Sequence, residues 1–283
     1  MDIRPSPIAG RWYPADASRL AQSIDGYLEA AQVEAPPGAI LGVVVPHAGH
    51  LYSGPVAAYA YQALRSLPVE VVAVLCPSHF HADGALLTTR HAAYSTPLGT
   101  VPVDRGALEA LAAELKPGPG GEPLLVELGR DREHAIEIQL PFLQRVLPPG
   151  FQLIPVMLRD QTPPVAQALG EALARRLEGR RALVVGSSDL SHYYPRPVAH
   201  QLDTEMLRQV ENFDPEGVLR AEAEGRGMAC GHGAIAAALW AMRALGANHC
   251  RVVRYATSGD VTGDNSEVVG YGAAVVWKEG VPA

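Results

Sequence analysis

Cysteine is scarce in this sequence, and basic residues never form a run. Three cysteines stand among 283 residues, with no Cys-x-x-Cys spacing. This argues against a disulfide framework or a cysteine-rich structural zinc cluster and favours a reducing, cytoplasmic setting. The net charge is −7, and no segment is rich in lysine or arginine. We therefore expect neither a nucleic acid nor an anionic membrane surface as a partner.

Targeting segments and the common nucleotide and hydrolase motifs are also missing. Residues 1–5 lack an apolar signal core. The most apolar long stretch, 227–247, carries His232 and Arg243, which is typical of a core helix rather than a membrane span. No Gly-x-Gly-x-x-Gly follows the first strand, and neither Gly-x-x-x-x-Gly-Lys nor Gly-x-Ser-x-Gly occurs. The sequence therefore gives no sign of a nucleotide-binding loop or a serine-hydrolase elbow.

Short apolar runs alternate with longer amphipathic segments along the whole chain. We expect strands at 40–45, 69–75, 84–89, 151–158, 181–186, 250–257 and 267–277, and helices at 17–31, 54–67, 134–147, 164–178, 198–211, 214–224 and 230–246. This alternation predicts an α/β fold with a mainly parallel or mixed central sheet, covered by helices on both faces. The low-complexity stretch 116–123 is typical of a surface loop, so we predict one domain, 1–283.

Polar residues that can bind a metal or move a proton follow three of the predicted strands. His47 follows the first strand and His79 the second, while Ser187-Ser188-Asp189, with His192 close behind, follows the strand at 181–186. Apolar, β-branched runs are typical of buried parallel strands. The carboxyl ends of such strands form the ligand edge of an open α/β sheet. We therefore expect these side chains to meet at one edge.

Metal binding is one chemistry that this pattern indicates. Two histidines at neighbouring strand ends, His47 and His79, can hold one divalent ion through neutral imidazole nitrogens. Cys230 begins a long Ala-rich helix, whose N-terminus would lower the pKa of a thiol and favour a metal-binding or reactive thiolate. The plainer alternatives are a turn histidine for His47, beside Gly49 and Gly54, and a small buried residue for Cys230.

Proton transfer is the second chemistry. Asp189 and His192 are three residues apart, so on a helical turn they would face the same way, and Asp189 could orient His192 as a general base. Asp189 could instead cap the N-terminus of a helix. His134, beside Glu133 at a predicted helix start, could be a general acid or part of a solvated polar face.

Several short motifs, in order along almost the whole chain, resemble those of the Memo family, known in bacteria as AmmeMemoRadiSam system protein B. The matching segments are Ala-Gly-Arg-Trp-Tyr at 9–13, Pro-His-Ala-Gly at 46–49, Tyr-Ser-Gly at 52–54, Pro-Ser-His at 77–79, Glu-His-Ala-Ile-Glu at 133–137, Leu-Pro at 140–141, Ser-Ser-Asp at 187–189 with His192, and Cys-Gly at 230–231. Each motif is unspecific alone, whereas the combination is highly specific.

The Memo family in turn resembles the catalytic subunit of class III extradiol dioxygenases, which hold non-haem iron(II). The resemblance implies a fold of that type. The residues that it implies are the metal ligands His47, His79 and Cys230, the base His192, the proton donor His134 and the neighbouring Asp189. It also implies copper or iron binding, and partnership with a radical-SAM protein and an AMMECR-type protein; an animal member of the family binds phosphotyrosine peptides.

Two imidazoles and one anion leave open positions on a metal ion, and iron(II) oxygenases use such positions to bind substrate and O₂ together. A thiolate in place of the dioxygenase carboxylate softens the site and favours iron, Cu(I) or zinc over magnesium or calcium. We therefore predict a metal-dependent redox protein with a divalent metal, iron first and copper or zinc as alternatives, acting on a small molecule or peptide. The alternatives are a non-catalytic peptide- or ligand-binding module that uses the same pocket, and a zinc-dependent hydrolase.

Overall fold

A mixed sheet of nine strands lies at the centre of the computed structural model, which describes residues 2–115 and 122–280. The strands are β1 (Ile3–Arg4), β2 (Gly38–Val45), β3 (Val71–Pro77), β4 (Leu86–Thr89), β5 (Ala93–Thr96), β6 (Gly99–Pro102), β7 (Leu125–Leu128), β8 (Gln152–Leu158), β9 (Ala182–Ser187), β10 (His192–Tyr194), β11 (His249–Thr257) and β12 (Val268–Glu279). The central sheet has the order β10-β12-β2-β9-β3-β8-β4-β7, with β11 paired to β12, while β1, β5 and β6 form a small second sheet.

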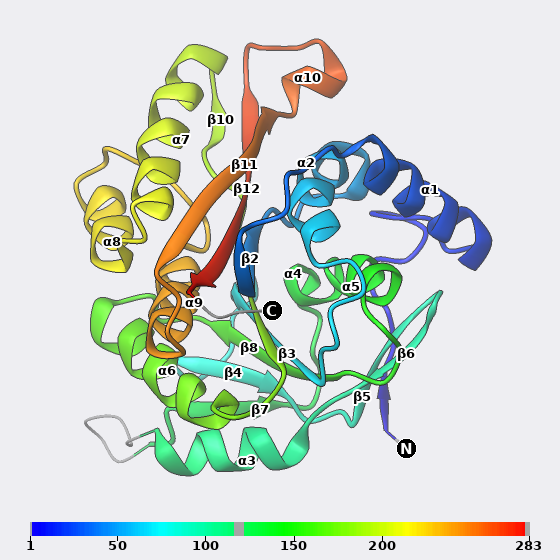
Figure 1. The fold of residues 1–283 in the computed structure, drawn as a ribbon, viewed down its shortest axis with the longest axis vertical. Helices are drawn as coiled ribbons and strands as arrows, with labels where there is room; N and C mark the ends of the chain where they lie inside the picture. The colour runs from blue at the N-terminus through cyan, green and yellow to red at the C-terminus, as the bar shows by residue number, and fades with distance from the viewer. Residues whose placement is uncertain (1, 116–121, 281–283) are drawn as a thin grey trace.

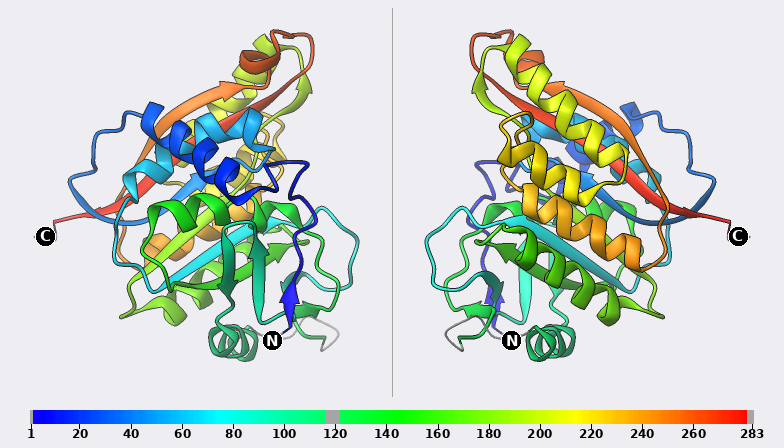
Figure 2. Two further views of the ribbon diagram at one scale, coloured as in Figure 1. Left: turned by 90° about the vertical axis from the view of Figure 1, so that its right-hand side faces the viewer. Right: turned by 90° about the vertical axis from the view of Figure 1, so that its left-hand side faces the viewer.

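Helices cover both faces of the central sheet (Figures 1 and 2). They are α1 (Ala17–Ala30), α2 (His50–Ala63), α3 (Arg105–Glu114), α4 (His134–Glu137), α5 (Leu140–Val146), α6 (Pro163–Leu177), α7 (Arg196–Glu211), α8 (Pro215–Ala223), α9 (His232–Ala244) and α10 (Gly259–Thr262). Helices α6 and α8 pack on α9, which lies on β9 and β3, whereas α1 and α5 pack on α2, which lies on β2 and β12. The predicted α/β class with helices on both faces is confirmed.

The central strands β2, β9, β3 and β8 run parallel, and the antiparallel pairs flank them. Val45 of β2 lies beside Ser187 of β9, and Leu75 of β3 lies beside Gly186. Every residue of β3 is buried, which explains why its sequence is continuously apolar rather than alternating. Because β2, β9 and β3 are neighbours, the residues that follow them start from one edge of the sheet.

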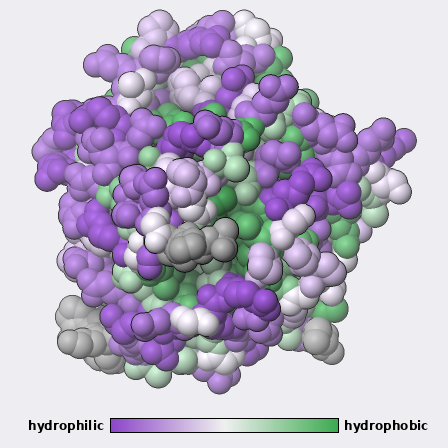
Figure 3. Space-filling view, viewed as in Figure 1, coloured by the Kyte–Doolittle hydropathy of each residue, from purple (hydrophilic) through white to green (hydrophobic). Residues whose placement is uncertain are grey.

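Hydrophilic residues cover most of the face shown in Figure 3, and hydrophobic ones show between them toward its centre. Among the described residues, no helix combines the length and the apolarity that crossing a bilayer requires. The apolar stretch that includes α9 is instead buried among α6, α8 and the sheet, as the sequence predicts.

Helix α2 differs from the prediction in its start. It begins at His50 instead of Gly54, and Pro55 lies inside it. The missing N–H of Pro55 leaves the carbonyl of Leu51 without its usual helical donor, and Leu51 is 62% exposed, so water can reach that end of the helix. Gly54 is therefore no turn residue: a Cβ there would lie 2.9 Å from the ring of Tyr27.

Other departures follow from proline and from short elements. The predicted helix 134–147 is divided into α4 and α5, because Pro141 has no N–H with which to continue α4. Strands β5, β6 and β7 were not predicted, since four residues carry too little periodicity. Helix α3 was also missed. Most of the predicted loop 116–123, namely 116–121, lies outside the described residues, and the single domain 1–283 stays a prediction.

Candidate metal centre

The ends of β2, β9 and β3 bring His47, Ser187, Asp189 and His79 to one edge of the sheet. A pocket of about 260 Å³ opens there. Its walls are Trp12, His47, Ala48, Gly49, His79, His134, Asp189, His192, Tyr193, Val269 and Tyr271. The expected convergence of strand ends is therefore confirmed.

The ring of His47 is held in one tautomer by Ser187. Its Nδ1 lies 3.1 Å from Ser187 Oγ, which already donates its hydrogen to Ala135 O and accepts one from Gln139 Nε2. Nδ1 must therefore be the donor in the pair, which leaves a lone pair on Nε2. Burial lowers the pKa of His47 to about 3, so the ring is neutral and Nε2 is ready to bind a metal.

His79 is oriented by the carboxylate of Glu133. The backbone N–H of His79 donates to Oε2 over 2.7 Å, and its Nδ1 pairs with Oε1 over 2.9 Å. Burial alone would raise the pKa of Glu133, but the bonds from His79 outweigh it and lower the pKa to about 2. An ionised carboxylate can only accept, so Nδ1 of His79 carries the hydrogen of this bond. That leaves Nε2 as the ligand atom of His79, the usual arrangement of metal-binding histidines.

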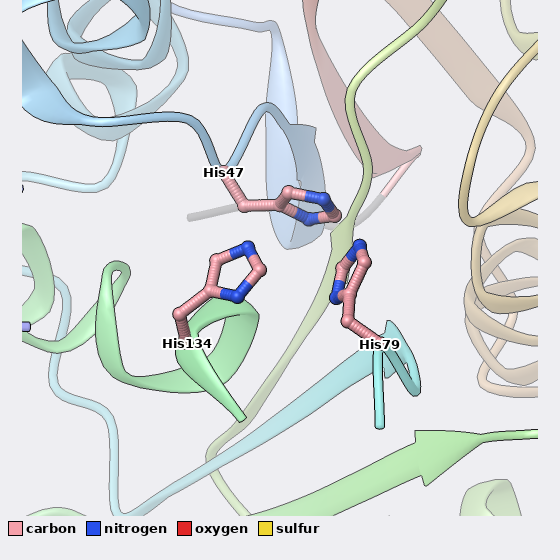
Figure 4. A group of neighbouring side chains, drawn as sticks. All are labelled: His47, His79 and His134. Carbon is pink, nitrogen blue, oxygen red and sulfur yellow. The ribbon is translucent and has the colours of Figure 1, made fainter. Parts of the chain in front are cut away.

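His134, the first residue of α4, completes a cluster of three imidazoles (Figure 4). One ligand atom from each of His47, His79 and His134 lies within 4.8 Å of the others. The ring of His134 packs on Trp12 with centroids 4.2 Å apart, and burial lowers its pKa to about 3. From the sequence we expect His134 to be a proton donor, and the geometry also makes it a candidate ligand.

Cys230 lies beside this cluster rather than within it. Its Sγ is 3.2 Å from His47 Nε2, yet the cluster of ligand atoms within 4.8 Å includes His134 and not Cys230. Zn–N and Zn–S bonds of about 2.0 and 2.3 Å at angles of 90–110° separate N from S by roughly 3.1–3.6 Å. A thiolate of Cys230 thus fits the same ion as His47 Nε2.

The backbone around Cys230 differs from the prediction. Helix α9 begins at His232, two residues later, with Gly231 as its N-cap. A Cβ at Gly231 would lie 2.9–3.0 Å from Pro77 and Ser187, so glycine lets the turn approach the strand ends. Burial, reinforced by the charge of Asp189, raises the pKa of Cys230 to about 12. The predicted lowering by a helix N-terminus is therefore wrong in the metal-free protein.

Asp189 and His192 do not share a helical turn. Residues 188–191 are irregular and His192 begins β10. Asp189 Oδ1 accepts from the backbone N–H of His47 (2.7 Å) and Ala48 (3.2 Å), and burial raises its pKa to about 6. Asp189 therefore fixes the His47 turn and caps no helix. His192 Nδ1 donates instead to Leu190 O over 2.9 Å, which leaves Nε2 as a hydrogen-bond acceptor.

A buried ionic network below the cluster was not predicted. Arg4 is fully buried and pairs with Asp131 at 2.8 Å and with Glu137 at 2.5 Å. Its guanidinium also donates to the carbonyl of Glu133 over 2.5 Å, and the Tyr13 hydroxyl donates to Glu137 over 2.6 Å. The network holds the segment that carries Glu133 and His134. A lone arginine near the chain start gave no signal of it.

The fold and this site define an α/β protein with a histidine pocket at the carboxyl edge of a parallel sheet core. The chain matches the model of the Memo family, described as Memo-like protein, over residues 4–275. It belongs to the Memo family. A MEMO1 family protein of Nitrosopumilus maritimus is 37% identical over 276 residues, covering 96% of this chain and 98% of that one. One of Methanothermobacter thermautotrophicus is 37% identical over 282 residues, covering 95% and 98%.

A solved structure shows a weaker similarity. The crystal structure of uncharacterized protein JW3007 from Escherichia coli K12 superposes with a TM-score of 0.49 at 12% identity, covering 84% of this chain and 99% of that one. A likeness of that size carries no conclusion about activity.

Proposed function

We propose that this Memo family chain is a metal-dependent redox protein, resembling class III extradiol dioxygenases, that holds one divalent ion, iron or copper, at the pocket. The observation that carries the proposal is the cluster of His47, His79 and His134, whose ligand atoms lie within 4.8 Å. Two of the three rings have their second nitrogen engaged by Ser187 and Glu133. Such support of the outer nitrogen is the usual companion of metal ligation.

The donor set suits a borderline or soft transition metal. His47 and His79 supply two imidazole nitrogens, and the third ligand is the thiolate of Cys230 or the ring of His134. Imidazole suits iron, copper and zinc, and a thiolate strengthens the preference over magnesium and calcium. With three protein ligands, open positions remain, at which non-haem iron would let substrate and O₂ meet.

The roles of the remaining polar residues follow from their hydrogen bonds and do not depend on where a metal ion lies. His192 Nε2 is an acceptor on the pocket wall and takes a proton from a bound substrate. Asp189 anchors the backbone of His47 and Ala48 and so fixes the ligand turn. If Cys230 is the third ligand, the neutral ring of His134 remains free to hydrogen-bond a bound substrate.

Metal analysis after anaerobic purification tests the proposal, together with O₂ uptake by the iron-loaded protein in the presence of catechol-like compounds. We expect His79→Ala to lose the ion and any O₂ uptake. His81→Ala is the matched control, because His81 lies in the same loop, is exposed and is not part of the cluster. Equal metal content in His79→Ala and His81→Ala would refute the proposed site.

Zinc-dependent hydrolysis is the second candidate, because three imidazoles with an open position also form catalytic zinc sites. Ester or amide cleavage that returns with zinc but not with iron would select it. A non-catalytic peptide-binding module is the third, and it gains support from Tyr193 on the pocket wall, which is 71% exposed. Tight peptide binding that a chelator does not weaken would select that role.

The setting of the protein is proposed from composition and family alone. The few cysteines, without a Cys-x-x-Cys spacing, favour the cytoplasm, and family resemblance suggests partnership with a radical-SAM protein and an AMMECR-type protein. Co-purification of tagged protein from its native cells checks the partnership.

A further inference from the structure

A second cavity lies between α6, α8 and the start of α9. Its volume is about 500 Å³, within the range of small-molecule sites. Its walls include Gln161, Pro163, Leu219, Glu222, His232 and Trp240. It shares no lining residue with the histidine pocket.

The hydrogen-bond donors on these walls are already engaged. The N–H of Gly233 donates to Gln161 Oε1 over 2.9 Å, and that of Thr162 donates to Asp160 Oδ1 over 2.9 Å. Pro163 and Pro164 have no N–H. The starts of α6 and α9 therefore offer few free amides to an anion, although helix N-termini commonly bind one. Arg220 is paired with Asp214.

The acceptors, by contrast, are left in surplus. His232 Nδ1 donates to Ala229 O over 3.1 Å, so its Nε2 carries a lone pair. The Oε2 atom of Glu222 accepts the N–H of Ala229 over 2.8 Å, while Oε1 has no hydrogen-bond partner among the described residues. An apolar cavity with a carboxylate and an imidazole acceptor complements a ligand with an apolar body and a positively charged donor.

The same wall residues hold the turn that carries Cys230. Glu222 and His232 bind the N–H and the carbonyl of Ala229, and Gln161 Nε2 donates to the carbonyl of Cys230 over 2.9 Å. Any ligand that moves these side chains must also disturb the turn. The 229–233 turn is thus the partition between the cavity and the histidine pocket.

We propose that this cavity is a second ligand site, for a small molecule with an apolar body and a protonated amine, and that its occupation is transmitted to Cys230. This inference is independent of the metal proposal, because it concerns the opposite side of the turn. A ligand in this cavity would shift Cys230 beside the histidine pocket without entering that pocket.

Titration of the metal-free full chain with n-hexylammonium chloride, followed by NMR, tests the proposal. The indole N–H of Trp240 reports on the wall, and the backbone amide of Cys230 reports on the turn. We expect saturable shifts of both signals with one shared Kd, and none with ammonium chloride at equal concentration. Absence of a saturable shift at Trp240 would overturn the site, and a Cys230 amide that stays still while Trp240 shifts would overturn the transmission.

Three variants sharpen the test. Ala223 is exposed on the cavity wall, so Ala223→Phe should fill the cavity and weaken hexylammonium binding more than ten-fold. Ala113→Phe, at an exposed position of α3, should leave that binding unchanged. Glu222→Gln keeps an acceptor for Ala229 but removes the charge. We expect Glu222→Gln to weaken the binding of hexylammonium roughly five-fold and to leave the binding of 1-hexanol unchanged. Binding that Ala223→Phe leaves intact would place the ligand elsewhere.

Discussion

Cys230 Sγ lies 3.2 Å from Nε2 of His47, the nitrogen that the hydrogen bond to Ser187 leaves free. His47 is also one of three imidazoles gathered with His79 and His134. It therefore belongs to two overlapping ligand sets, one with sulfur and one with nitrogen alone. Which set binds the ion decides how soft the site is, and hence which metal it prefers.

Cys230→Ala and His134→Ala separate the two sets. We expect the anaerobically purified protein to hold about one ion per chain, Cys230→Ala to reduce it sharply, and His134→Ala to leave it nearly unchanged. The reason is the preference of iron, copper and zinc for an anionic ligand beside two imidazoles. Metal retained in Cys230→Ala but lost in His134→Ala would instead establish the all-histidine set.

Glu133→Gln should weaken metal binding without removing a ligand. The carboxylate holds both the Nδ1 and the backbone N–H of His79, and loss of such a partner typically costs 10–100-fold in metal affinity. Competition against a chromogenic chelator measures the change. Glu109→Gln on the exposed face of α3 is the control, and an equal affinity in the two variants would show that Glu133 is a structural residue only.

The convergence of polar residues at one edge of the sheet was predictable because it depends on local patterns. Three apolar runs, each ending in His47, His79 or Asp189, are enough to place those residues at one edge once the strands are parallel. The sheet order makes β2, β9 and β3 neighbours, so the prediction needed no further information.

The sequence could not reveal contacts between segments that are far apart along the chain. Arg4 meets Glu137 across 133 positions, and no local pattern marks such a pair. The irregular segment before His192 was mistaken for a helical turn because spacing alone cannot show that β12 pairs with β10. The pKa of Cys230 was mistaken for the same reason, since the burial and the Asp189 charge that raise it come from segments distant in the sequence.

The neutral histidines should make the metal-free protein sensitive to mild acid. Burial lowers the pKa of His47 and His134 from 6.5 to about 3, and that of His50 to about 4. A group whose pKa is lower in the folded state contributes stability above its unfolded pKa and loses it as the pH falls. These three histidines should therefore lower the free energy of unfolding from pH 6.5 downward, by at most about 1.4 kcal/mol per pH unit for each. The raised pKa values of His79 and Asp189 act in the opposite direction and offset part of this decline.

His134→Gln should flatten that decline, because one of the three depressed groups is gone. Urea unfolding of metal-free protein between pH 7 and pH 4 measures the slope. His81→Gln, in the exposed loop, is the control and should keep the slope of the unsubstituted chain. An identical slope in His134→Gln and His81→Gln would contradict the assignment of a neutral, partly buried His134.

Gly270→Ala should disturb the segment that leads to His192. A Cβ at Gly270 would lie 2.0 Å from Asp203 Oδ2, and Asp203 is a fully buried residue that accepts from the N–H of Ser191 and the hydroxyl of Tyr255, each over 2.8 Å. We expect a loss of about 2–3 kcal/mol in the free energy of unfolding. Gly26→Ala in α1, where nothing lies within 4 Å, should instead gain up to about 1 kcal/mol.

A double-mutant cycle identifies the cause of that loss. In an Asp203→Ala background the added methyl group meets no carboxylate, so Gly270→Ala should cost clearly less than it does in the original chain. Urea denaturation of the four proteins at pH 7 measures the coupling. Additive effects would mean that Gly270 is required for the backbone of β12, and that Asp203 supports the His192 segment independently of it.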